Sequence, residues 1–181
     1  MSATVSIRRW TGSSGDPTKT DITSINTRAN AEDAHSTAGT SNSILIPEAG
    51  SNYSYWVNTR LSVDTISGGT VDNIKWYSDG SNGFGTGVTC VGNSADDYVQ
   101  ATGTPGETGD VLNETNNTEL TAAPTDVFGF TSASPKSITG SASTTGDVGQ
   151  FFVYQMVIAS TAGSGATNQE TFTWQYDDTS S

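Results

Sequence analysis

Apolar and polar side chains alternate with a period of two along several short segments of the chain. The clearest is residues 53–65, where one parity holds Tyr53, Tyr55, Val57, Leu61 and Val63 and the other is mostly polar. Successive side chains of a strand point to opposite faces of a sheet, so this pattern predicts a strand with one buried face. Residues 71–77 repeat it after a Ser-Gly-Gly turn, and we expect the two strands to pair as a hairpin.

The last third of the chain carries two more strong strand signals. Residues 151–158 are apolar on both parities, which places that strand in the middle of a sheet. Residues 171–176 alternate three aromatic side chains with Thr, Thr and Gln. Further strands are expected at residues 4–10, 44–46, 84–91, 97–101, 127–131 and 137–141, and one short helical turn at residues 30–35.

These segments are separated by runs of Gly, Ser, Asn, Thr and Asp, which are turn formers. About nine or ten short strands predict an all-β fold, an antiparallel two-sheet sandwich of the jelly-roll or immunoglobulin-like kind. We expect residues 1–20 to form an extended N-terminal arm and residues 21–181 a single sandwich domain.

Composition changes this picture only slightly. Leu occurs four times and the formal net charge is −12, which is unusual for a domain with a large core. Four Trp, six Tyr and six Phe supply the missing bulk, since each buries about 150–250 Å². Abundant Thr and Val favour strands over long helices.

Charge and apolar patterning exclude some partners. Nineteen acidic against seven basic residues would repel a phosphate backbone, so nucleic acid is not expected as a partner. No apolar run approaches the roughly 20 residues of a membrane helix, and residues 1–5 do not look like a signal peptide. We therefore expect a protein made in the cytoplasm with no membrane partner.

Candidate catalytic residues are few. His35 is the only histidine, and Cys90, the only cysteine, lies in a segment that reads as strand with no activating neighbour. The carboxylate doublets at residues 96–97 and 177–178 consist of adjacent residues, which point to opposite faces of a strand. We predict no enzyme activity and no cofactor.

Two loops resemble ligand-binding motifs. Residues 79–83 (DGSNG) offer oxygen ligands for calcium but lack the alternating carboxylates and terminal Glu of a known calcium loop. Residues 83–87 (GFGTG) lack the helix start and Lys of a phosphate cradle. Both are predicted to be turns, and no metal site is assigned.

Tryptophans offer a binding alternative. Trp56, Trp76 and Trp174 could form a platform for sugar rings, as in carbohydrate-binding modules. Trp76 and Trp174 share parity with apolar neighbours, which indicates the core. Trp56 opposes the apolar parity of its strand, so it could lie in a second packed layer, at an interface or against a ligand.

Three stretches together carry a resemblance to a known group of proteins. They are Ser54-Tyr55-Trp56, residues 73–80 (NIKWYSDG) and residues 170–177 (ETFTWQYD). With them, residues 20–178 resemble virion proteins of tailed phages that are encoded in capsid-region gene clusters. The resemblance implies a β-rich particle component of the capsid decoration or minor capsid type, with no catalytic residues to carry over.

We therefore expect a structural component of a phage particle, located on the capsid surface. Copies would associate as a homo-oligomer and bind the major capsid protein by strand edges or by the arm. Arg8 and Arg9 in the arm, together with Trp56, are the candidate interface residues. A phage tail or fibre protein and a carbohydrate-binding β-sandwich module are the alternatives.

Overall fold

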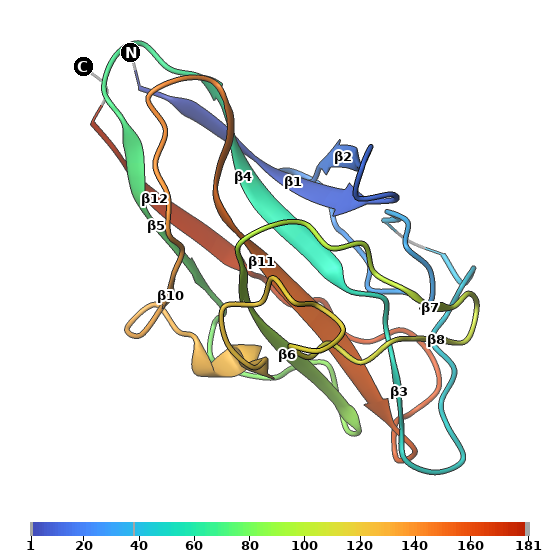
Figure 1. Cartoon of the computed structure of the whole chain (residues 1–181). Helices are drawn as coiled ribbons and strands as arrows, with labels where there is room; N and C mark the ends of the chain where they lie inside the picture. The colour runs from blue at the N-terminus through green and yellow to red at the C-terminus, as the bar shows by residue number, and fades with distance from the viewer. Residues whose placement is uncertain (1, 38, 180–181) are drawn as a thin grey trace.

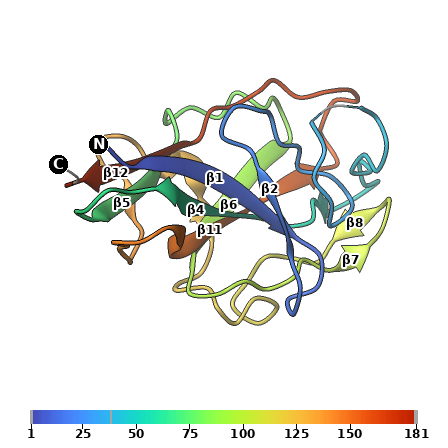
Figure 2. The same ribbon diagram turned by 90° about the horizontal axis from the view of Figure 1, so that it is seen from above.

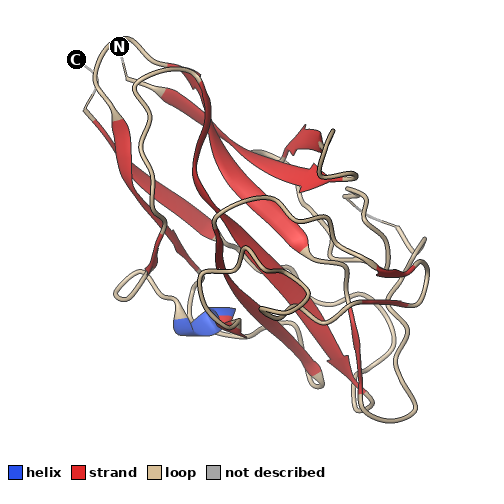
Figure 3. Ribbon diagram, in the orientation of Figure 1, coloured by secondary structure: helices blue, strands red, loops and turns tan. Residues whose placement is uncertain are grey.

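The computed structural model describes residues 2–37 and 39–179, and its regular elements there are β-strands apart from one 3₁₀ helix, η1 (Val127–Gly129) (Figures 1 and 3). The large sheet has the order β2 (Thr18–Asp21), β1 (Thr4–Thr11), β4 (Val57–Thr65), β11 (Gly146–Ala159), β6 (Val88–Ala95) and β9 (Thr125–Asp126), with β3 (Ser51–Tyr53) also on β11. The small sheet has the order β10 (Lys136–Ser137), β5 (Val71–Tyr77) and β12 (Thr173–Asp178). A ribbon joins β7 (Gly103–Thr104) and β8 (Thr108–Gly109). Every pairing is antiparallel, so the all-β antiparallel class is confirmed.

The main core lies between the two sheets. β4 contributes Leu61 and Val63 from the large sheet, and β5 contributes Ile74 and Trp76 from the small one, each at most 1% exposed. The aromatic side of β12 packs on the same core through Trp174 and Tyr176, together with Phe172 just before the strand. The alternation in the sequence therefore predicted the inward side chains of these strands correctly.

A second core covers the other face of the large sheet. On β11, Phe152 and Tyr154 point into the main core, whereas Phe151 and Val153 point into the second. The second core is closed by side chains of the loops between β6 and β9, namely Tyr98, Ala101, Leu112 and Leu120. These loops lie over the large sheet (Figure 1), and Figure 2 shows the same arrangement from above. β11 is thus buried on both faces, as its continuous apolar run predicted.

The predicted hairpin between residues 53–65 and 71–77 is wrong. β4 pairs with β1 and β11, and β5 pairs with β10 and β12, so the two strands belong to different sheets. The turn between them contains Gly68 and Gly69, at φ of 72° and 75°. Both strands have one apolar parity because they face the same core from opposite sides, and parity does not reveal the pairing partner.

The expected arm is also corrected by the structure. β1 lies inside the large sheet, where it pairs with β2 along residues 8–11 and with β4 along residues 4–10. Val5 and Ile7 pack against the main core, so burial of apolar surface fixes this strand in the domain. Met1 lies outside the described residues.

Several other local predictions differ from the structure. Residues 30–35 contain bends at 31–34 and no helical turn, and residues 44–46, 97–101 and 127–131 are not strands. At residues 127–131 the reason is a capping contact, because the Asp126 side chain accepts a hydrogen bond from the Phe128 N–H and starts η1. At residues 97–101 the chain leaves the sheet so that Tyr98 and Ala101 can close the second core.

Candidate functional site

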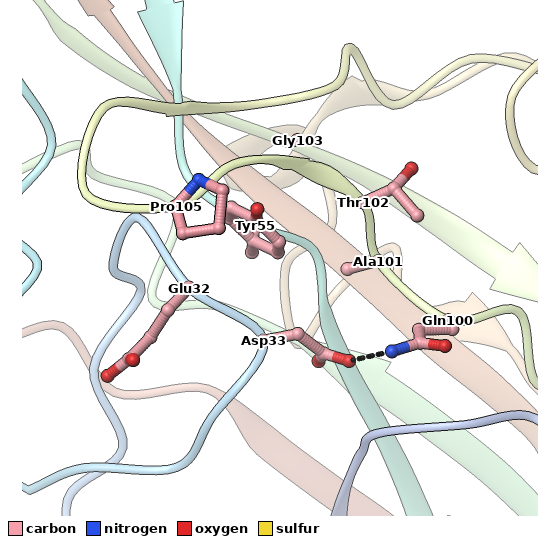
Figure 4. A pocket seen from close by; sticks show the side chains of 8 residues that line it. All are labelled: Glu32, Asp33, Tyr55, Gln100, Ala101, Thr102, Gly103 and Pro105. Carbon is pink, nitrogen blue, oxygen red and sulfur yellow. Dashed lines mark hydrogen bonds between the residues drawn. The ribbon is translucent and has the colours of Figure 1, made fainter.

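A hollow of about 300 Å³ opens where the loop after β2 meets the loop before β7 (Figure 4). Its lining consists of Glu32, Asp33, Tyr55, Gln100, Ala101, Thr102, Gly103 and Pro105. Tyr55 is only 4% exposed and belongs to the second core, so its ring forms the floor of the hollow.

Asp33 is the central polar group of this hollow. Its Oδ2 accepts hydrogen bonds from the Gly12 N–H at 2.8 Å and from Gln100 Nε2 at 3.2 Å, the second of which is drawn in Figure 4. The carboxylate therefore ties the end of β1 to two loops that are distant in sequence. Burial raises the pKa of the Asp33 carboxyl, although these hydrogen bonds and Arg9 partly oppose the shift.

Arg9 supplies a positive charge beneath the same loop. Its side chain is 0% exposed, and Nη1 donates to Thr27 Oγ1 at 2.7 Å and to the Arg28 carbonyl at 2.5 Å. Burial lowers the pKa of the guanidinium, while Tyr154 and Asp33 act in the opposite direction. Arg9 therefore holds the loop against the sheet from within.

The geometry of the hollow limits its chemistry. Figure 4 shows the Glu32 carboxylate directed away from Asp33, so the two do not converge on one point as an acid and base pair would. The amide of Gln100 and the hydroxyl of Thr102 are engaged with Asp33 and with Asp110. These hydrogen bonds connect loops to one another, and the hollow reads as a structural junction.

The candidate interface residues are placed differently from one another. Trp56 is 1% exposed, packs in the second core and donates from Nε1 to the Asp110 carbonyl at 2.8 Å. Trp56 and Arg9 are both enclosed within the single chain, so neither side chain is presented at its surface. Arg8 is partly exposed and forms a 3.0 Å ion pair with Asp64, and its interface role stays a prediction.

Two of the three tryptophans considered for a sugar-binding platform are buried. Trp56 lies in the second core and Trp76, also 1% exposed, in the main core, on opposite faces of the large sheet. Trp174 is partly buried against the main core. The three tryptophans therefore do not form one exposed surface, and of the alternatives for Trp56 the second packed layer is the one observed.

The remaining candidates for chemistry also have structural environments. Cys90 is fully buried in β6, and burial raises the pKa of its thiol strongly, which disfavours the nucleophilic thiolate. His35 lies against Thr27, with 3.3 Å between Nδ1 and Oγ1. Asp96 accepts from Gln150 Nε2, and Asp177 accepts from Asn73 Nδ2. Each carboxylate doublet thus joins neighbouring segments.

The loop at residues 79–83 forms a turn stabilised by its own side chains. Asp79 Oδ1 accepts a hydrogen bond from the Ser81 N–H at 2.9 Å, which is the geometry of an Asx-turn. Across residues 2–37 and 39–179, no three His, Cys, Asp or Glu side chains come together in a way that could hold a metal ion. In the same residues no helix has the length and apolar character to cross a membrane.

Sequence reasoning missed one polar residue that organises the second core. Gln155 is 0% exposed; its Oε1 accepts from the Leu112 N–H at 2.8 Å and its Nε2 donates to the Ser54 and Asp110 carbonyls, each at 2.7 Å. A lone Gln inside an apolar strand was the available signal, because a buried amide needs several hydrogen-bond partners.

Comparison of the chain with protein-family models, with curated proteins and with solved structures finds no match.

Proposed function

We propose that the protein is a structural component of a phage particle, of the capsid decoration or minor capsid type, which self-associates and binds the major capsid protein. The observation that carries the proposal is the double covering of the large sheet. The small sheet buries one of its faces, and the loops between β6 and β9 bury much of the other. Strand edges and end loops are then the surfaces left for association.

The sequence resemblance supports the same proposal independently. Its three stretches fall on structural elements: Trp56 in the second core, residues 73–80 largely in β5, and residues 170–177 largely in β12. A particle component needs a stable scaffold and a binding surface. The finer fold assignment, jelly-roll or immunoglobulin-like, stays a prediction from the sequence.

Association with particles is the direct test. The tagged chain should sediment with purified phage particles and remain bound after washing, and it should form an oligomer by light scattering. Antibody labelling in electron micrographs should mark the capsid shell. Labelling of the tail would favour the tail or fibre alternative, and a monomer that does not bind particles would contradict the proposal.

A further inference from the structure

A buried arginine anchors the segment of residues 27–36. The Arg9 side chain is 0% exposed and forms no ion pair with a carboxylate in the part of the chain that the structure describes. Its Nη1 donates to Thr27 Oγ1 and to the Arg28 carbonyl, whereas Nε and Nη2 have no hydrogen-bond partner there. A buried charge is unfavourable unless it is paired. A second positive charge close to Arg9 is therefore disfavoured.

One hydroxyl group connects Arg9 to His35. Thr27 Oγ1 lies 3.3 Å from His35 Nδ1 and 2.7 Å from Arg9 Nη1. A guanidinium has donors only, so Thr27 Oγ1 accepts from Arg9 and its own O–H is left to donate. His35 Nδ1 accepts that O–H with its lone pair, and this network assigns the imidazole proton to Nε2. The series of hydrogen bonds from Arg9 through Thr27 to His35 therefore requires a neutral imidazole.

Protonation of His35 is incompatible with this order of donors. An imidazolium carries a proton on both ring nitrogens, so Nδ1 can no longer accept the Thr27 O–H. Among residues 2–37 and 39–179 this O–H has no second acceptor. The new positive charge also lies near Arg9, and burial together with the Arg9 guanidinium lowers the pKa of His35. Both effects favour the neutral imidazole while the segment is in place.

The other charged and titratable groups act on Arg9. They come from three parts of the fold, namely Tyr154 of β11, Tyr98 of the loops between β6 and β9, and Asp33 and Glu32 of the segment itself. Arg9 is the charged group that acts on His35. In the described residues no carboxylate forms an ion pair with His35 that would stabilise an imidazolium.

The remaining contacts of the segment show what depends on this arrangement. The Arg28 N–H donates to the Ser36 carbonyl at 2.9 Å, which closes the segment on itself. The Tyr55 N–H donates to the Asn30 carbonyl at 2.8 Å, and Ala29 packs against the main core. The segment is thus held on the large sheet at one end through Thr27 and at its middle through Asn30.

We propose that Thr27 and His35 form a pH-sensitive switch that holds residues 27–36 on Arg9 when His35 is neutral and loosens them from β1 when His35 is protonated. The sign follows from the lowered pKa of His35 in the folded chain. The stabilising contribution is complete above the ordinary histidine pKa of about 6.5 and is lost as pH falls below it. The inference does not depend on the proposed function.

Hydrogen exchange of the Arg28 amide, followed by NMR in the full chain, tests the switch. The rate is expressed relative to that of an unprotected amide at each pH, because exchange itself depends on pH. From about pH 7.5 to about pH 5 we expect protection of Arg28 to fall about fivefold or more, a common size for coupling between two sites. The amide of Val153, inside β11, should keep its protection. An NMR titration of the His35 ring should give a midpoint below about 6.5.

Two variants separate His35 from other titrating groups. His35→Asn keeps an oxygen that can accept from Thr27 and carries no charge, so protection of Arg28 should no longer fall with pH. The Asp33 carboxylate still titrates in this variant, so the difference from the natural chain reports His35. Thr27→Val should lower protection of Arg28 at both pH values and bring the His35 midpoint closer to its ordinary value. Thr40→Val, the same change at an exposed position of the same loop, should alter neither.

Several results would overturn the switch. The first is an equal pH-dependent loss of protection in His35→Asn. A His35 midpoint at or above about 6.5 would contradict the disfavoured imidazolium. An equal loss at Val153 would mean that the whole domain opens. Finally, a Thr27→Val variant with unchanged Arg28 protection and unchanged His35 titration would remove Thr27 from the mechanism.

Discussion

Trp76 of β5 and Phe152 of β11 stack across the main core, with ring centroids 3.6 Å apart and planes inclined by 11°. Both side chains are at most 1% exposed, and this contact joins the small sheet to the large one. Phe130 meets both rings edge-on, at centroid distances of 6.3 Å and 6.0 Å. A small group of aromatic rings therefore links the two sheets across the main core.

Truncation of either ring should lower the free energy of unfolding. We expect Phe152→Ala to lower the free energy of unfolding by about 3–5 kcal/mol, because it removes a large buried ring and leaves a cavity. A double-mutant cycle with Trp76→Ala, measured by denaturant unfolding, should give a coupling of about 0.5–1.5 kcal/mol. Strict additivity of the two single losses would contradict a direct ring contact.

Gln155 should behave as a structural hub of the second core. Gln155→Leu keeps the side-chain size but removes the hydrogen-bond partners of the Leu112 N–H and the Ser54 carbonyl. We therefore expect the free energy of unfolding, measured with urea, to fall by about 3 kcal/mol. Gln175→Leu, at an exposed position of β12, is the control and should change stability by less than about 0.5 kcal/mol. Equal effects at the two positions would argue against the hub.

Gly140 and Gly146 form a matched pair for testing close backbone contact. Their φ angles are similar, at +133° and +130°. A Cβ on Gly140 would clash with the Cα of Gly149, whereas a Cβ on Gly146 would meet nothing within 4 Å. Gly146→Ala should lower the free energy of unfolding by about 1–3 kcal/mol, because of backbone strain alone. Gly140→Ala should lower the free energy of unfolding clearly more, as measured by thermal unfolding. A smaller decrease than for Gly146→Ala would contradict the close approach of the two backbones.

Asp33 should make stability depend on pH. Burial raises the pKa of its carboxyl in the folded chain, so the folded state holds the proton more strongly than the unfolded state. The contribution of Asp33 to stability is therefore greatest below the ordinary carboxyl pKa and falls as pH rises through the raised value.

The variant Asp33→Asn removes this titration and keeps an oxygen that can accept from the Gly12 N–H. We expect its unfolding free energy, relative to that of the natural chain, to increase from about pH 3 to about pH 7. The measurement is chemical unfolding over that pH range. A relative stability that decreases with pH would mean that the carboxylate gains more from its hydrogen bonds and Arg9 than it loses by burial.

The sequence predicted side-chain direction better than chain pairing. Parity alone places Leu61 and Trp76 on a buried face, and both lie in the main core. The hairpin between their strands was wrong, because two strands that face one core from opposite sheets show the same alternation as two neighbours in one sheet. The junction at Asp33 left no periodic signal, since its contacts come from loops.

What the sequence by itself determined was the β class, the inward parity of each strong strand and the central place of residues 151–158. These features follow from the two-residue period of a strand, which is local. The tertiary structure decided that β1 joins the large sheet, that Trp56 lies in a second core and that β12 is the outer strand of the small sheet. Those facts depend on contacts between residues far apart in the chain. The physical reason is that hydrophobic burial is non-directional. It requires that an apolar side chain be buried, but it does not specify which segment covers that side chain.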